Sequence, residues 1–300
     1  MSTAPALDRA PALAASEWRA REAAHQQRAD ALTAGWRSRQ QSGEQHPIDD
    51  FLFTYYSYKP SILRRWHPGA GIELTDAAGA PRATWKWYVP GAEPGSVRVD
   101  AAAFLHAKRA SVEAICRILE KTAARPGQFG CFGLHEWAMV YRQREHRHAV
   151  PLRLGQEQTD AVVEGHRIQC SHFDAFRFFT PEAVPLNRLQ PTREAQSELE
   201  QPGCLHAGMD VYKWAIKLGP LVPGEVLLGA FELARDIRWL DMAASPYDVS
   251  AWGAEPVAIE TPAGKAEYVR RQREFAERSN ALRLRVLDAV AVARRDAGVE

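Results

Sequence analysis

The chain has 300 residues, with a hydrophobic fraction of 46%, a charged fraction of 25% and a net charge of +1. These values are typical of a folded globular protein and exclude a disordered chain, a collagen-like fibre and a long coiled coil. No apolar run approaches the roughly 18 residues of a membrane span, and the first residues lack the basic start and apolar block of a signal peptide. We therefore expect a cytoplasmic protein that does not bind membranes.

Four cysteines, at positions 116, 131, 170 and 204, are too few and too scattered for a disulfide scaffold. No two of them form a CxxC pair, so the sequence does not predict a structural zinc site. It also has no GxGxxG fingerprint, P-loop, HExxH or GxSxG motif, and it lacks the HxE and PCxxC pair of zinc base deaminases. We therefore expect no cofactor and no resident metal.

Helix signals dominate the chain, and β signals are few. Residues 1–15 are rich in Ala and Pro and are expected to form a disordered tail. Residues 16–300 show no dividing point, which predicts a single compact domain that is mainly α with a small β element. The β-like runs are 83–89, 150–154 and 162–170, whereas 171–180 is too aromatic to assign. The segments with helical periodicity and end signals are 17–41, 49–57, a short helix ending at Trp66, 101–124, 134–144, 205–218, 224–243 and 262–297.

Acidic, aromatic and basic residues crowd together between positions 49 and 67, where prolines interrupt the backbone. Tyr55 and Tyr56 have rings that can stack on a base, and Arg64 and Arg65 can hold phosphate. The alternative is a core segment whose tyrosine hydroxyls reach the surface.

Two further acidic residues stand beside histidines. His135 and Glu136 open a helix after a glycine-rich bend, where a backbone can approach a ligand closely. Alternatively, Glu136 only complements the helix dipole. Asp174 follows His172 and lies among four phenylalanines, including Phe176, so desolvation would raise its pKa and suit it to acid–base chemistry. The alternative for Asp174 is an ion pair with a nearby arginine at the edge of the core.

His206, Asp210 and Lys213 follow one another at spacings of four and three residues. If 205–218 is helical, these spacings place all three side chains on one stripe. Such a stripe would serve either as half of a metal site or as an acid–base pair.

Seven strings of the sequence resemble those of a protein family of about this length that is common in actinobacteria and is labelled 3-methyladenine DNA glycosylase. The resemblance covers about 17–287, which is nearly the whole chain. The strings are DFLFTYYSY, LRRWHPG, CFGLHEWAMVYR, CSHFDAFRFFT, QPGCLHAGMD, FELARDIRWLDMAASPYD and FAERSNALR.

This resemblance implies a monomeric DNA glycosylase that acts on double-stranded DNA containing a modified base. The implied base is an alkylated purine or a hypermodified cytosine, such as the glucosylated hydroxymethylcytosine of phage DNA, and the second substrate would imply phage defence. The chain lacks the helix-hairpin-helix and following Asp of the well-studied alkyl-base glycosylases, and it lacks the GQDPYH-type loop of uracil glycosylases. No catalytic residue is therefore transferred from those enzymes.

Base excision requires a ring-lined pocket for the extruded base, cations for the DNA backbone and a carboxylate that stabilises positive charge on the sugar. We expect Lys213 to pair with Asp210 rather than to form a Schiff base, which predicts a monofunctional enzyme that leaves an abasic site. The expected catalytic residues are Asp174, Asp210, Glu136, His172 and His206; the base-binding residues are Tyr55, Tyr56, Phe176, His135 and Lys213; and the backbone-binding residues are Arg64, Arg65, Arg142, Arg144 and Arg147.

Two other classes of function remain open at this point. One is a metal-dependent enzyme acting on a small molecule. The other is a DNA-binding protein without catalytic activity. The ligands of the metal-dependent enzyme would come from His135, Glu136, His172, Asp174, His206 and Asp210.

Overall fold

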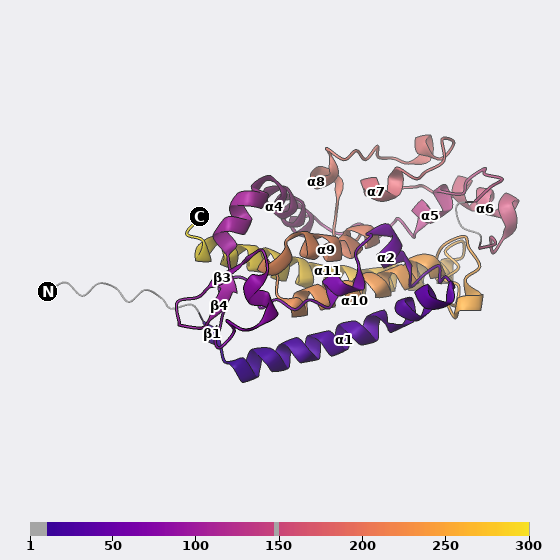
Figure 1. Cartoon of the computed structure of the whole chain (residues 1–300). Helices are drawn as coiled ribbons and strands as arrows, with labels where there is room; N and C mark the ends of the chain where they lie inside the picture. The colour runs from indigo at the N-terminus through magenta and orange to yellow at the C-terminus, as the bar shows by residue number, and fades with distance from the viewer. Residues whose placement is uncertain (1–10, 147–149, 300) are drawn as a thin grey trace.

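The computed structural model describes residues 11–146 and 150–299. Within these residues it has eleven α-helices and one four-stranded sheet, which confirms the predicted mainly α fold with a small β element. Figure 1 shows the long helices running along the molecule, with the sheet near one end and α5, α6 and α7 near the other.

Five long helices build the body of the protein. Helix α10 packs against α9, α11 and α1, while α4 packs against α11. The longest, α11, has 35 residues and therefore spans about 52 Å at 1.5 Å per residue. Their bounds are Ala15–Ser42 (α1), Ala101–Ala124 (α4), Leu205–Lys217 (α9), Gly224–Ala243 (α10) and Pro262–Asp296 (α11).

Local sequence signals explain where these helices begin and end. The side chain of Asp100 accepts a hydrogen bond from the backbone N–H of Ala103 and caps α4. Thr261 caps α11 in the same way, with a proline at the first helical position. Gly219 has a φ of 53° and directly follows α9 and its C-cap, where glycine adopts the left-handed backbone without a steric penalty.

The sheet is small and has the strand order β1-β2-β4-β3. Strand β1 pairs with β2 in parallel, and the other pairs are antiparallel, with Leu74 opposite Val97 and Tyr88 opposite Val99. The strands are Ala12–Leu13 (β1), Glu73–Leu74 (β2), Tyr88–Pro90 (β3) and Val97–Val99 (β4).

The expectation of a disordered tail over 1–15 is wrong for its last residues. Pro11 and Leu13 accept backbone hydrogen bonds from Glu73 and Thr75, and Leu13 also packs against the core. Backbone pairing together with apolar burial therefore orders this segment, and α1 already begins at Ala15. Residues 1–10 lie outside the described residues.

Three predictions near the middle of the chain are also wrong. The helix expected over 134–144 ends early, because α5 spans only Leu134–Ala138 and turns follow it. The expected strands at 150–154 and 162–170 contain only the isolated bridges of Leu152 with Tyr247 and of Ile168 with Asn187. Helix α6, Gly155–Glu164, lies between the two expected strands and takes in the first three residues of the second, since burial of Thr159 and Val163 on one helical face outweighs the β preference of the valines.

The remaining helices are short and lie between the long ones. The structure gives α2 at Phe51–Tyr55 and α3 at Pro60–Leu63, so the two short helices expected before residue 67 are present with narrower bounds. The others are α7 at Phe173–Phe176 and α8 at Gln196–Leu199.

One continuous core of buried apolar side chains extends from Trp18 in α1 to Ala293 in α11. Among the described residues, no helix combines the length and apolar character that crossing a bilayer requires.

Candidate functional site

Helix α9 is the central element of the site. All eight residues from Leu205 to Tyr212 are buried, because the helix is enclosed by α10, α11 and the segments before it. The helical prediction is confirmed, and His206, Asp210 and Lys213 project their side chains into one polar cluster within the core. Polar groups at such depth need partners, and the structure provides them from five other segments.

Asp210 is the hub of the first half of the cluster and is 2% exposed. Its Oδ1 accepts a hydrogen bond of 2.8 Å from the Tyr56 hydroxyl, and its Oδ2 faces the Lys213 ammonium and lies 3.3 Å from His172 Nε2. Burial alone would raise the pKa of Asp210, but the charge of Lys213, supported by His172, holds this pKa well below its usual range. Asp210 is therefore a carboxylate whose oxygens are fully engaged.

His172 lies between two carboxylates. Its Nε2 is 3.2 Å from Glu200 Oε1, in addition to its contact with Asp210. Burial alone would lower the pKa of His172, yet Glu200 and Asp210 together raise it above 6.5. Burial raises the pKa of Glu200 itself. His172 thus joins the segment before α7 to the C-terminal end of α8.

Arg238 and Asp241 of α10 form the second half of the cluster. Arg238 donates hydrogen bonds of 2.6 Å to Glu136 and 2.7 Å to Asp241, and both α10 side chains are essentially inaccessible to solvent. His135 Nε2 lies 2.9 Å from the other oxygen of Asp241. These contacts tie α5 to α10 through buried ion pairs.

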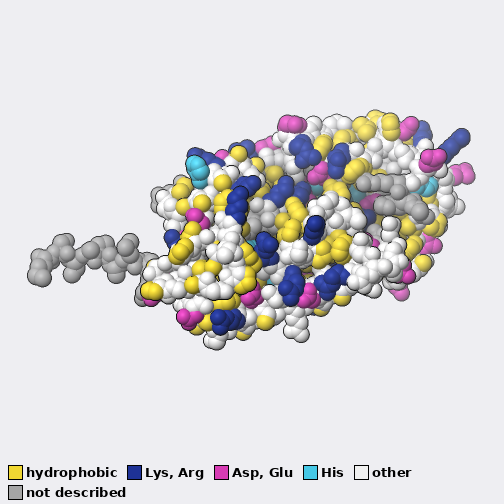
Figure 2. Space-filling model, viewed as in Figure 1, with side chains coloured by type: hydrophobic (Ala, Val, Ile, Leu, Met, Phe, Trp, Pro, Cys, Tyr) yellow, Lys and Arg dark blue, Asp and Glu magenta, His cyan; other side chains and the backbone are white. Residues whose placement is uncertain are grey.

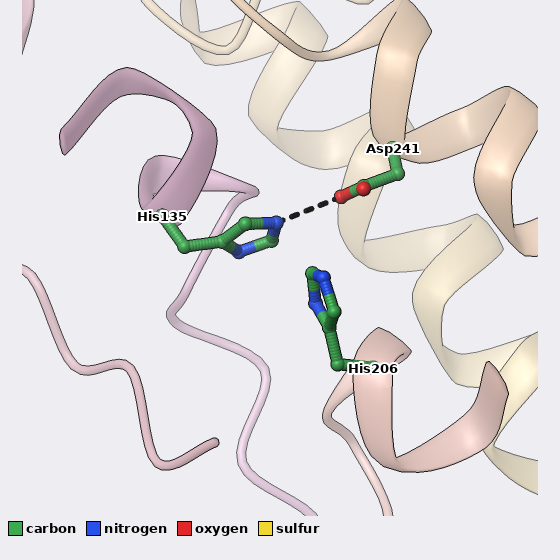
Figure 3. Close-up of side chains that lie close together, drawn as sticks. All are labelled: His135, His206 and Asp241. Carbon is green, nitrogen blue, oxygen red and sulfur yellow. Dashed lines mark hydrogen bonds and ion pairs between the residues drawn. The ribbon is translucent and has the colours of Figure 1, made fainter. Parts of the chain in front are cut away.

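His206 connects the two halves. Figure 3 shows His135, His206 and Asp241 converging from α5, α9 and α10. The His206 ring meets the His135 ring edge-on at 4.4 Å and lies 5.3 Å from the His172 ring. Burial alone would lower the pKa of His135, but Asp241 raises this pKa well above its usual value. For His206, burial and the nearby His135 both lower the pKa, which lies well below 6.5. His206 is thus a neutral imidazole between two histidines whose pKa values are raised.

A hollow of about 180 Å³ opens beside this cluster, and we refer to it as the site hollow. Its walls combine aromatic rings with two carboxylates, a guanidinium and an imidazole. Its lining residues are Phe51, Thr54, Tyr55, Glu136, Met139, Asp174, Phe178, His206 and Arg238.

Asp174 is the more exposed of the two carboxylates that line the site hollow, with 11% of its side chain exposed against 6% for Glu136. The prediction that phenylalanines surround this carboxylate is wrong. Arg177 Nε is 3.2 Å away, a terminal nitrogen of Arg193 is 3.3 Å away, and Lys213 Nζ is 3.5 Å away. The one-turn helix α7 directs Asp174 towards these cations, so the carboxylate is ion-paired.

The structure therefore brings together all five expected catalytic residues. Glu136, Asp174 and His206 line the site hollow, and Asp210 and His172 form the layer behind it. Lys213 connects the site hollow to that layer, because its ammonium contacts both Asp174 and Asp210.

The expected base-binding residues are divided. Tyr55 lines the site hollow, whereas Tyr56 lies behind it with its hydroxyl on Asp210. Phe176 packs in the core against Phe179, and Phe178 is the phenylalanine of that segment whose ring lines the hollow. Lys213 and His135 belong to the polar cluster behind the walls.

The expected backbone-binding arginines do not gather at the hollow. Arg64 pairs with Asp30 at 3.0 Å, and Arg142 pairs with Glu164 at 2.7 Å. Arg65 is exposed over the Trp85 ring at 4.7 Å from its centroid. Arg144 is exposed in the turn region after α5, and Arg147 lies outside the described residues.

Three residues of the cluster were missed from the sequence: Glu200, Arg238 and Asp241. A signal existed for the α10 pair, because Arg238 and Asp241 continue the apolar stripe of Phe231 and Ala234 at helical spacing. Charged residues on the buried face of a helix are rarely without partners. Glu200 follows a one-turn helix in a polar loop, and nothing in its local sequence distinguishes it.

Two triplets have the composition of metal ligands: His135 with His206 and Asp241, and His172 with Glu200 and Asp210. In each triplet the donor atoms lie within 4.8 Å of one another. Imidazole and carboxylate donors suit zinc or iron. However, a metal would have to share Asp241 with the Arg238 guanidinium and Asp210 with the Lys213 ammonium.

A scan of protein-family models, a search of curated proteins and a search of solved structures each found no match to this chain.

Proposed function

We propose that the chain is a DNA glycosylase that hydrolyses the N-glycosidic bond of a modified base and leaves an abasic site. The observation that carries this proposal is the site hollow, in which aromatic rings and two carboxylates from separate elements face one enclosed space. An enzyme that acts on a base inside a nucleic acid must extrude that base into such a pocket.

The rings of the site hollow supply a surface on which a planar base can stack. Phe51 and Tyr55 come from α2 and stack on each other at 5.0 Å, and Phe178 follows α7. Glu136, held by Arg238, and the neutral imidazole of His206 supply hydrogen-bonding groups for the polar edge of the base. Stacking of one base on an aromatic ring contributes about 1–3 kcal/mol to binding.

Asp174 is the carboxylate that we assign to the sugar, because it is the more exposed of the two in the site hollow and lies close to three cations that can hold phosphate. As the bond between C1′ and the base nitrogen breaks, its electron pair leaves with the base and positive charge develops on the sugar. The carboxylate stabilises that charge and accepts a proton from the water whose oxygen adds to C1′.

An alkylated purine is the base that fits this arrangement best. Such a purine carries a positive charge before cleavage, so the departing electron pair neutralises it and no general acid is needed. Carboxylates and ring faces both attract a cationic base. The site hollow, at about 180 Å³, also lies below the roughly 300–1,000 Å³ of pockets for drug-sized ligands, and the glucose of a glucosylated cytosine would extend past Asp174.

Lys213 supports a monofunctional mechanism. A lyase needs an uncharged lysine that attacks C1′ and forms a Schiff base. Burial alone would lower the pKa of Lys213, but Asp210, which it contacts directly, raises this pKa. Lys213 therefore stays an ammonium and acts as an electrostatic link between Asp210 and Asp174.

We also propose that the enzyme works in the cytoplasm, where a glycosylase has access to DNA. The four cysteines are all free thiols, which fits a reducing compartment.

The direct test is incubation of the protein with alkylated, deaminated and phage-modified DNA, followed by mass spectrometry of the free bases released. We expect release of alkylated purine, and a loss of about 100- to 1,000-fold in rate for Asp174→Asn. The matched control is Asp236→Asn, which removes a carboxylate that also pairs with arginines but lies on the other side of α10. DNA binding without release of any base by the wild-type protein would assign the chain to the non-catalytic class.

The two metal-type triplets favour a second candidate, a metal-dependent enzyme that acts on a small molecule. Elemental analysis of the purified protein separates the two functions. Stoichiometric zinc or iron that is lost in the His206→Ala variant, together with activity that a chelator abolishes, would favour the metal enzyme. Base release that continues after chelation would favour the glycosylase.

A further inference from the structure

A second hollow, of about 450 Å³, lies outside the site described above. It is bordered by α3, the segment that includes β3, the first half of α4 and the C-terminal end of α9, and we refer to it as the aromatic groove. Four aromatic side chains and four cationic side chains line it: Trp85, Trp87, Tyr88 and Phe104, and Arg65, Lys86, Lys108 and Lys217.

The charges of the aromatic groove have one sign. No Asp or Glu is among its lining residues. Arg65, Lys86, Lys108 and Lys217 are all exposed, and none of them forms an ion pair among the described residues. Arg65 lies over the Trp85 ring and Lys86 over the Trp87 ring, at 4.7 and 4.6 Å from the centroids. A ring with a cation beside it is the arrangement that binds a base and its phosphate together.

Another hollow shows that such a surface is not a general feature of this protein. The hollow between α1, α10 and α11, of about 680 Å³, is also lined by arginines and tryptophans. There, however, Arg39 pairs with Asp50, and Arg278 pairs with Asp236. Three of its four lining arginines, Arg39, Arg235 and Arg278, therefore have carboxylate partners within the protein, whereas the four cations of the aromatic groove have none among the described residues.

Helix α9 connects the aromatic groove to the site hollow. Lys217 lies eleven residues after His206, the α9 residue that lines the site hollow, which corresponds to about 16 Å along the helix axis, the length of about five stacked nucleotides. Lys213 lies between them, and both lysines approach the Trp214 ring. Figure 2 shows Lys and Arg side chains distributed across the middle of the face on which β3, α9 and α2 lie in Figure 1.

We propose that the aromatic groove binds an unpaired stretch of the DNA strand that flanks the extruded nucleotide, an inference that rests on the proposed function. Trp87 stacks on a base, while Lys86, Lys108 and Lys217 hold the phosphates. The Trp85 ring carries Arg65 and Arg82 over it and positions Arg65 at the groove. Bases in a duplex present their faces to each other and not to a protein ring, so the protein prefers single-stranded or locally melted DNA.

The test is fluorescence anisotropy with a labelled 20-nucleotide oligothymidine and with a 20-base-pair duplex, both free of modified bases. We expect tighter binding to the single strand. Lys86→Glu, Lys108→Glu and Lys217→Glu each lower the affinity by about tenfold and reduce the slope of log affinity against log salt by about 0.7. Trp87→Leu keeps an apolar contact with Phe104 and lowers the affinity by about 5- to 150-fold.

The matched control is Arg117→Glu, an equal change of charge at an exposed position on the same helix. Arg117 lies nine residues after Lys108, beyond the kink of α4 at Lys108, and does not line the aromatic groove. Tighter binding to the duplex, or equal effects of Lys108→Glu and Arg117→Glu, would overturn the groove assignment. Base release by groove variants with unchanged DNA affinity would also refute the groove but leave the proposed function standing. Groove-dependent binding without base release would refute only the proposed function.

Discussion

The two halves of the buried polar cluster use the same arrangement with a different cation. In one half, Asp210 contacts His172 and Lys213; in the other, Asp241 contacts His135 and Arg238. In both, the cation lies three residues from its aspartate on the same helix. Arginine keeps its charge and binds carboxylates with a fixed fork, whereas lysine is a compact charge that a hydroxyl or a histidine can partly replace.

This difference separates a fully buried half from a half that extends towards solvent. Arg238 holds two carboxylates, Glu136 and Asp241, and is 1% exposed. Lys213 has 12% of its side chain exposed and extends from Asp210 to Asp174 at the wall of the site hollow. The arginine half therefore ties α5 to α10 inside the core, and the lysine half sets the charge at one wall of the site hollow.

The largest expected effect comes from removing each cation in turn. Arg238→Met leaves Glu136 and Asp241 buried without their common partner and is expected to lower the free energy of unfolding by about 3–5 kcal/mol. Lys213→Met is expected to cost less, because Asp210 keeps His172 and Tyr56. Urea denaturation of both variants measures the difference. Equal losses of stability in the two variants would show that the halves do not differ as we describe.

A smaller effect is expected from the hydroxyl that completes the lysine half. Tyr56→Phe removes the 2.8 Å hydrogen bond to Asp210 and leaves a buried carboxylate oxygen without a donor. We expect a loss of about 1.5–3 kcal/mol in unfolding free energy, as for other hydrogen bonds to charged groups.

Tyr141→Phe is the matched control for this hydrogen bond. The Tyr141 hydroxyl also donates to a carboxylate at 2.8 Å, but its acceptor Glu164 is on the surface, with 49% of its side chain exposed. Water can replace the lost donor there, so the cost is expected to stay below about 1 kcal/mol. If both variants lose the same stability, burial of Asp210 does not determine the strength of its contacts.

The sequence predicted the long helices because their signals are local. Helix α4 has the expected bounds, since the Asp100 cap and the proline after Arg125 both act within a few residues of the helix ends. In α6, by contrast, the adjacent Val162 and Val163 favoured a strand, and only contacts made in the folded protein decide for the helix.

The site could be predicted only in part for the same reason. The sequence predicted His206, Asp210 and Lys213 because about one helical turn separates each of them from the next. Arg238 meets Glu136 across 102 positions of sequence, and such a pair has no local signal. Phe176 and Phe178 differ in role because the single turn of α7 directs one ring into the core and leaves the other at the site hollow.

The smallest expected effect is a pH dependence of stability that comes from His135. In the folded protein its pKa is raised well above 6.5, the ordinary value that applies to the unfolded chain. At a pH between 6.5 and the raised pKa, the folded protein therefore binds this proton and the unfolded chain does not. The stabilisation is therefore complete below pH 6.5 and is lost as the pH rises through the raised pKa. The groups that face His135 are Asp241, His206 and Cys131. His172, whose pKa is also raised, contributes in the same direction.

We expect the unfolding free energy to fall between pH 7 and 9 by up to about 1.4 kcal/mol per pH unit for each such proton, as measured by urea denaturation at a series of pH values. His135→Gln removes its share and makes the profile flatter, whereas His106→Gln, an exposed position on α4, leaves the profile unchanged. A profile that is just as steep in His135→Gln would mean that Arg238 alone stabilises the charge of Asp241. The two halves of the cluster would then share the positions of their residues but not the electrostatic role of the histidine.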